Sequence, residues 1–193
     1  MKNKKKRVIL DKSKMSRAIT RIAHEILERN SGAESLVMVG ILTRGAILAK
    51  RLAAIIKDIE GVDIPVGLMD INLYRDDVNS NPDQPIVRTT EMLFDITDKN
   101  LILVDDVLFT GRTIRAAMSQ LVEFGRAMTI QLAVLVDRAH RQLPIRADYV
   151  GKNIPTNFDD NVRVYFQDSD DVDEVVLYPT GDKQLESEGG DGE

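Results

Sequence analysis

The stretch LILVDDVLFTGRT, Leu101–Thr113, decides the fold class of this chain. An apolar run, Leu101–Val104, leads to two adjacent acids and then to a small polar turn, Thr110–Thr113. A run without polar residues predicts a strand that is buried on both faces, because a strand with one solvent-exposed face would alternate apolar and polar residues. The turn opens a helix from about Arg112 to Phe124, which ends at Gly125. We therefore expect a strand–turn–helix unit of an α/β sheet.

The rest of the chain alternates between apolar runs and amphipathic segments. Apolar residues three and four positions apart predict helices at Ser13–Arg29, capped by Asp11 or Ser13, and at Ala46–Ile59. In the second helix the apolar side is expected to be Leu48, Leu52, Ile55 and Ile59. The expected strands are Leu36–Ile41, Val66–Tyr74, Leu101–Val104, Thr129–Val136, Asp148–Lys152, Val162–Phe166 and Val175–Tyr178. This alternation predicts a mostly parallel central sheet flanked by helices, with ligands beyond the carboxyl ends of the strands.

The chain has 193 residues and a net charge of −5, but the charge is unevenly spread. Lys2–Arg29 has ten bases and three acids, whereas Gln167–Glu193 has ten acids and one base. Binding to nucleic acid depends on such local patches rather than on the total charge. We expect a single domain over residues 1–180, with a basic arm over residues 1–7. Residues 181–193, rich in Gly and acids, are expected to form a disordered tail.

Composition also narrows the class of protein. There is no cysteine, which excludes disulfide and thiolate chemistry and favours a reducing, cytoplasmic location. The basic start MKNKKKR is followed only by Val8-Ile9-Leu10 before Asp11, too few apolar residues for a secretion signal. No run is long enough to span a membrane.

The turn Thr110–Thr113 has the features of a phosphate site. The first amide groups of a helix are unpaired and carry the positive end of its dipole, Gly111 allows close approach, and two threonines add hydroxyls. The lysine and spacing of the nucleotide P-loop are missing. Asp105 and Asp106 would repel a phosphate but accept hydrogen bonds from vicinal hydroxyls, and a divalent cation would moderate their repulsion. A phosphate followed by a diol outlines a ribose 5-phosphate. The alternative, a strand-to-helix turn with one Asp as cap, leaves the other acid unexplained.

LILVDDVLFTGRT resembles the phosphoribosyl diphosphate (PRPP) signature of type I phosphoribosyltransferases. Together with TRIAHEILERN, VGILTRG, INLYRDD and LAVLVDRAHRQLPIRADYVGKNIPT, it is similar to the bifunctional pyrimidine-operon attenuation proteins that are also uracil phosphoribosyltransferases. The likeness runs from about Val8 to Thr156. It implies the type I phosphoribosyltransferase fold, with a small hood formed by the terminal segments. It also implies formation of UMP and pyrophosphate from uracil and PRPP, with Mg²⁺ carried by PRPP rather than held by a firm protein ligand.

The resemblance also implies roles for individual residues. The catalytic residues would be Asp105 and Asp106, which bind the ribose hydroxyls and favour the cationic sugar, and Arg138, near the base. The turn Thr43–Gly45 matches a pyrophosphate loop, and the segment Tyr74–Arg88 matches a lid over the site. Without the resemblance, the arginines of this segment would be interpreted as solvated surface residues. The full set of PRPP-binding residues would be Thr43, Arg44, Gly45, Arg75, Arg88, Asp105, Asp106, Val107, Leu108, Phe109, Thr110, Gly111, Arg112 and Thr113.

A second activity is implied for a polar, basic face of the first helix. Arg17, Thr20, Arg21 and His24 recur at spacings of three and four opposite the apolar stripe. Taken alone, this is a solvated helix face. The resemblance implies that it binds a stem-loop of pyrimidine-operon mRNA, with UMP or UTP as co-regulators, and that the protein is a homo-oligomer, a dimer or higher. The RNA-binding residues would be Thr20, Arg21, His24, Arg141, Arg146 and Lys152.

Three other functions stay open at this point. The chain could be a salvage enzyme whose basic face binds nothing, or an RNA regulator that uses the PRPP pocket mainly as a nucleotide sensor. A purine phosphoribosyltransferase is the third. A measurement of RNA binding tests the salvage enzyme, and the turnover rate with uracil tests the RNA regulator. A comparison of guanine, hypoxanthine and uracil as substrates tests the purine enzyme.

Overall fold

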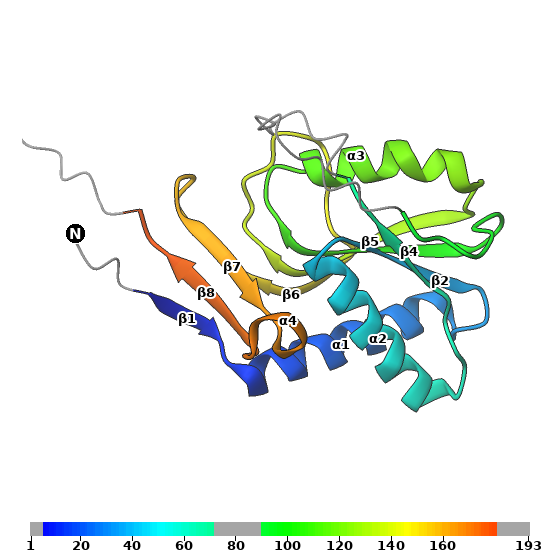
Figure 1. Cartoon of the computed structure of the whole chain (residues 1–193), viewed down its shortest axis with the longest axis horizontal. Coiled ribbons are helices and arrows are strands. Elements are labelled where there is room, and N and C mark those ends of the chain that lie inside the picture. Colours follow the sequence, from blue (N-terminus) through cyan, green and yellow to red (C-terminus); the bar gives the residue numbers. More distant parts are fainter. Residues whose placement is uncertain (1–5, 72–89, 181–193) are drawn as a thin grey trace, which may run out of the picture.

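A computed structural model of the chain describes residues 6–71 and 90–180 (Figure 1). Its centre is a five-stranded parallel sheet with the strand order β3-β2-β4-β5-β6. The strands are β2 (Leu36–Ile41), β3 (Val66–Met69), β4 (Asn100–Leu108), β5 (Thr129–Asp137) and β6 (Tyr149–Asn153). The expected α/β fold with a mostly parallel central sheet is confirmed: these five strands are all parallel, and one isolated antiparallel bridge joins Leu68 of β3 to Glu91.

Helices cover both faces of the sheet (Figure 1). On one face lie α1 (Lys12–Asn30) and α2 (Arg44–Glu60), and on the other lies α3 (Arg112–Leu121), extended by the 3-10 turn Val122–Phe124. Alternate residues of β4 enter the two cores: Leu101 and Leu103 pack in the cluster that holds Ile114 of α3, and Ile102 and Val104 in the cluster with α1 and α2. Burial on both faces explains why this strand is an unbroken apolar run.

The hood is a small antiparallel sheet with the order β1-β8-β7, beside the central sheet (Figure 1). It consists of β1 (Arg7–Leu10), β7 (Asn161–Tyr165) and β8 (Glu174–Tyr178), with the short helix α4 (Gln167–Asp170) between β7 and β8. The expectation of a hood made from both terminal segments is confirmed. However, Arg7 belongs to β1 and not to a basic arm, because β1 pairs with β8 and buries Leu10. Residues 1–5 of the expected arm and the expected tail lie outside the described residues.

The first helix follows its sequence signals closely. Of the two proposed caps, Asp11 is the N-cap: its carboxylate accepts a hydrogen bond from the Lys14 N–H at 2.9 Å. The helix ends at Asn30, and its C-cap Ser31 has a left-handed backbone with a φ of 56°. The apolar residues that recur at spacings of four, three and four along this helix are all buried: Met15, Ile19, Ile22 and Ile26.

Other boundaries differ from the expectations. The second helix begins at Arg44, two residues before the expected Ala46, and its buried side ends at Ile56, whereas Ile59 is 41% exposed because the last turn extends past the core. The strand β3 ends at Met69, before the expected Tyr74. β4 continues past Val104 through both acids to Leu108, because β5 continues beside it as far as Asp137.

Candidate active site

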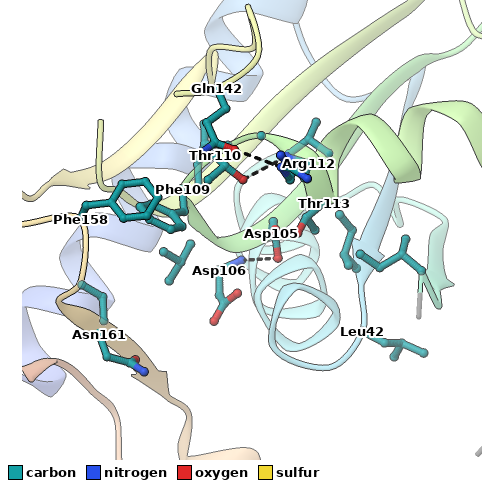
Figure 2. A pocket seen from close by; sticks show the side chains of 17 residues that line it. Leu42, Asp105, Asp106, Phe109, Thr110, Arg112, Thr113, Gln142, Phe158 and Asn161 are labelled. Carbon is teal, nitrogen blue, oxygen red and sulfur yellow. Dashed lines mark hydrogen bonds between the residues drawn. The ribbon is translucent and has the colours of Figure 1, made fainter. Parts of the chain in front are cut away.

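A cavity of about 730 Å³ opens where β2 and β4 end (Figure 2). The registers explain why it forms there: Gly40 of β2 pairs with Val104 of β4, so the turn after β2 lies beside the two acids. The cavity is lined by Ile41, Leu42, Ile71, all residues from Asp105 to Ile114, Gln142, Phe158, Asn161 and Val162. This is the edge of a parallel sheet at which ligands bind in such folds.

The acid pair, Asp105 and Asp106, lies at this cavity with Phe109 and Phe158 on one side and Leu42 on the other (Figure 2). Side chains alternate between the faces of a strand, but so near to its end both acids reach the same cavity. Asp105 is only 7% exposed, and its Oδ1 accepts a hydrogen bond from the Asp106 N–H at 3.0 Å. Burial raises the pKa of Asp106, opposed by the hydrogen bond with Asp105 and the positive charge of Arg44. Hydrogen bonds from hydroxyl groups would therefore stabilise the ionised form of Asp106.

The phosphate turn, Thr110–Thr113, borders the same cavity and opens α3. Gly111 is the N-cap with a φ of 93°, a left-handed conformation that glycine adopts without steric cost. The turn is held from outside by Gln142, whose N–H donates to the Thr110 carbonyl at 3.0 Å and whose side chain accepts from Arg112 Nε at 3.1 Å. The structure thus brings the expected diol site and the expected phosphate site into one cavity.

The TRG turn, Thr43–Gly45, packs directly against the acid pair. A Cβ added to Gly45 would lie 2.5 Å from the Val104 carbonyl oxygen and 3.0 Å from Asp105 Cα, so only glycine fits there. The peptide bond that leads into the turn, between Leu42 and Thr43, is cis. Leu42 lines the cavity, and Thr43, Arg44 and Gly45 follow it immediately. Arg44 Nη2 donates to Asp170 of the hood at 2.9 Å.

Arg138, expected to be a catalytic residue near the base, is buried and bonded to backbone carbonyl groups. It is 6% exposed, its Nη2 donates to the carbonyls of Asn157 at 3.1 Å and Asp160 at 2.8 Å, and its guanidinium lies 4.0 Å from the centre of the Phe109 ring. Burial lowers the pKa of Arg138, opposed by the negative charge of Asp160. It holds the loop that carries Phe158 and is not among the residues lining the cavity. We therefore describe Arg138 as a positioning residue.

Several residues that line the cavity have no counterpart in the sequence predictions. The largest is Phe158, whose ring centre lies 5.1 Å from that of Phe109 and 5.8 Å from that of His140. Phe158 is 53% exposed, and an aromatic residue in the polar segment TNFDDN was the available signal. The other residues missed are Ile41, Leu42, Ile71, Ile114, Gln142, Asn161 and Val162. The expected pyrophosphate contacts Arg75 and Arg88 lie outside the described residues, as does the whole of the expected lid, Tyr74–Arg88.

The residues expected to bind RNA fall into two groups. His24, Arg146 and Lys152 are exposed and Thr20 is half-buried. Arg21 is exposed too, but its Nη2 donates to the carbonyls of Val150 at 2.9 Å and Gly151 at 2.6 Å, so it ties α1 to β6, the strand that carries Lys152.

Arg141 is different, because its guanidinium is committed to internal contacts. Its Nη1 donates to the Phe109 carbonyl at 2.9 Å, its Nε donates to the Ile145 carbonyl at 2.8 Å, and it forms an ion pair with Asp137. A role in direct phosphate contact therefore suits Arg146 and Lys152 better than Arg141.

Neither a metal cage nor a membrane-spanning helix is found in the described parts of the chain. Residues 6–71 and 90–180 contain no cluster of three or more His, Asp or Glu side chains that could hold a metal ion. Within the same ranges, no helix combines the length and the apolar character that crossing a membrane requires. Among the residues that line the cavity, the carboxylates are those of Asp105 and Asp106.

Comparison with known proteins gives consistent matches. Residues 7–168 match the model of the phosphoribosyl transferase domain. The chain is 56% identical over 177 residues to the bifunctional protein PyrR of Deinococcus deserti, and the alignment covers 92% of this chain and 97% of the relative. It is 55% identical over 175 residues to the bifunctional protein PyrR of Bacillus subtilis, covering 90% and 97%.

Solved structures give the same fold. The hypoxanthine phosphoribosyltransferase of Trypanosoma cruzi, in complex with the product IMP, superimposes with a TM-score of 0.69 over 93% of both chains. At 17% sequence identity, this similarity shows the fold alone.

Proposed function

This chain belongs to the phosphoribosyl transferase domain family and, within it, to the bifunctional PyrR proteins, and from this we infer that it converts uracil and PRPP to UMP and pyrophosphate and also regulates the pyrimidine operon through its mRNA. The observation that carries the enzymatic half is the single cavity shared by the acid pair and the phosphate turn. A phosphate cradle and a diol acceptor a few residues apart suit a ribose 5-phosphate.

The cavity suggests where each part of PRPP binds. The 5-phosphate lies on the phosphate turn, where the amide groups of the first turn of α3 and the hydroxyls of Thr110 and Thr113 donate hydrogen bonds. The two ribose hydroxyls donate to Asp105 and Asp106. Since the raised pKa of Asp106 comes from burial, hydrogen bonds from hydroxyl groups and a nearby cationic sugar stabilise its ionised form.

The pyrophosphate group would leave towards the TRG turn, where Arg44 supplies positive charge. Mg²⁺, when bound with PRPP, would neutralise part of the charge that develops on this leaving group, and Asp105 and Asp106 are the residues suited to hold it. The chain's own contribution is to orient PRPP from both ends, so that the base meets the anomeric carbon in one geometry.

The base is expected on the hood side of the cavity, against the aromatic wall of Phe109, His140 and Phe158. Asn161, which lines the same side, offers both a donor and an acceptor to a nucleobase edge. The test is UMP formation, measured side by side with uracil, guanine and hypoxanthine at saturating PRPP. We expect product with uracil alone, and consumption of PRPP only in the purine reactions would overturn the assignment.

For the regulatory half, we propose that the mRNA binds along α1 and β6, through Thr20, His24, Arg146 and Lys152, with Arg21 fixing the two elements. Exposed Arg and Lys give salt-dependent affinity for phosphates, and Thr and His side chains can bond to unpaired bases. Filter binding of pyrimidine-operon leader RNA, with and without UMP, tests this. Tighter binding with UMP is expected, and equal retention of an unrelated stem-loop would leave only a salvage enzyme.

The same proposal includes a cytoplasmic location, where PRPP and nascent mRNA are both available, and a homo-oligomer that could join the basic faces of two copies. Light scattering on the purified chain measures the oligomer directly, and a mass of one chain at all concentrations would contradict it.

A further inference from the structure

We propose that Asp170, in the hood, is a built-in counter-ion for Arg44 that occupies this arginine until the pyrophosphate group of PRPP displaces it. The inference rests on the proposed function, because it assigns Arg44 to the pyrophosphate side of the cavity. It adds a role for a hood residue that lies far from the acid pair in the sequence. The juxtaposition that carries it is the contact between the TRG turn and α4.

The carboxylate of Asp170 is fixed in place by its own segment. Its Oδ2 accepts hydrogen bonds from the Phe166 N–H at 3.1 Å and from the Ser169 hydroxyl at 2.8 Å, which leaves Oδ1 for Arg44 Nη2 at 2.9 Å. Burial would raise the pKa of Asp170, but these hydrogen bonds and the charge of Arg44 outweigh it and hold the pKa below its usual value. Asp170 is therefore an ionised, pre-oriented partner.

Arg44, in contrast, is incompletely satisfied. Its Nε is buried and, within residues 6–71 and 90–180, has no hydrogen-bond partner. A buried donor without a partner costs about 1–3 kcal/mol, so this guanidinium gains by moving to a ligand with more acceptor oxygens. Asp170 offers it one oxygen, whereas a pyrophosphate group offers several and more negative charge.

Arg44 also lies within electrostatic range of the acid pair, because its charge acts to lower the pKa of Asp106. An arginine that paired with Asp106 would occupy the oxygens that the ribose hydroxyls need. Asp170 holds Arg44 on the hood side instead, and thereby keeps the acid pair open for the sugar. After the reaction, the same carboxylate competes for Arg44 and so favours release of pyrophosphate.

The test compares two variants of the full chain that remove one negative charge each from the same short helix. Asp170→Asn removes the partner of Arg44, and the matched control Asp168→Asn removes an exposed partner of Arg51. Pyrophosphate with Mg²⁺ is titrated calorimetrically onto each protein, and UMP, which has no pyrophosphate group, is titrated separately.

We expect Asp170→Asn to bind pyrophosphate about fivefold more tightly than wild type. This ratio corresponds to the largest interaction free energy that is typical of a partly exposed ion pair. UMP affinity should not rise, because a released Arg44 competes with the ribose hydroxyls for Asp106, and Asp168→Asn should match wild type for both ligands. Ser169→Ala, which loosens Asp170 without removing it, should tighten pyrophosphate binding less. This second variant keeps the inference testable if Asp170→Asn does not fold.

Unchanged or weaker pyrophosphate binding in Asp170→Asn would overturn the inference, since weaker binding would mean that Asp170 orients Arg44 for its ligand. If the wild-type chain takes up neither pyrophosphate nor UMP, the proposed function itself is rejected. Uptake of both ligands by wild type, with no difference in Asp170→Asn, rejects this inference alone.

Discussion

The substitution Gly45→Ala tests whether the TRG turn positions the acid pair. The added Cβ would meet the Val104 carbonyl oxygen at 2.5 Å, almost an ångström inside ordinary van der Waals contact, which begins at 3.4 Å. Both atoms that it meets most closely, Val104 O and Asp105 Cα, are backbone atoms of β4, so no side chain can rotate away. The start of α2 and the strand must therefore move apart.

Overpacking of this kind costs about 1–3 kcal/mol of the free energy of unfolding. The larger effect is expected at the site, because the strain falls on the backbone of Asp105. A displacement of about 1 Å in a catalytic arrangement can cost about a hundredfold in rate, so kcat/KM for PRPP should fall at least tenfold, that is, by about 1.4 kcal/mol or more.

A matched control lies at the other end of the same helix. Gly61, the C-cap of α2, has a φ of 72° and no atom within 4 Å of an added Cβ. Gly61→Ala should lower the free energy of unfolding by about 1 kcal/mol through backbone strain and leave kcat/KM for PRPP unchanged. Urea unfolding and steady-state UMP formation are measured on both variants. If Gly45→Ala is folded and retains wild-type kcat/KM, the packing of this turn does not position the acid pair, and the reasoning is wrong.

Three further predictions concern single residues. Burial raises the pKa of Asp106, so the ionised carboxylate destabilises the folded protein as pH rises above the ordinary carboxyl range. Asp106→Asn should therefore raise Tm more at about pH 8 than at about pH 4, and it should abolish PRPP binding. An equal change in Tm at both pH values would contradict this. Asp11→Ala should cost about 1 kcal/mol in urea unfolding without changing UMP formation, because it removes only the cap of α1, and a loss of activity would contradict that view. Arg146→Gln should reduce the slope of log Kd for leader RNA against log salt concentration by about one. Arg141→Gln should leave this slope unchanged and lower Tm, because its guanidinium bonds to carbonyl groups of the protein. A reduced slope for Arg141→Gln would show that Arg141 contacts an RNA phosphate.

The central strand and its site were accessible from sequence because their signals are local. An apolar run buried on both faces, an acid pair and a turn that opens a helix follow one another within thirteen residues, Leu101–Thr113. The first helix was predictable for the same reason, since Asp11 and the apolar spacing lie in one segment. The start of α2 was not, because Thr43 makes no side-chain cap hydrogen bond and no sequence signal marks the boundary.

The hood and the roles of the arginines depend on contacts between distant segments. Three apolar residues after a basic start do not predict a strand, and β1 forms because it pairs with β8, near the far end of the chain. Arg138 and Arg141 have the sequence character of ligand contacts, but their donors are used by carbonyl groups of the surrounding loops. Phe158 reaches the cavity on a loop whose carbonyl groups accept hydrogen bonds from Arg138.

The most direct test of the central claim is equilibrium binding of labelled PRPP, with Mg²⁺, to the purified full chain. The claim is that one cavity holds the phosphate on the turn Thr110–Thr113 and the ribose hydroxyls on Asp105 and Asp106. Saturable uptake at one site per chain is predicted, with loss of that uptake in the double variant Asp105→Asn, Asp106→Asn while it remains folded. No saturable uptake by the wild-type chain, or undiminished uptake by the folded double variant, would contradict the claim.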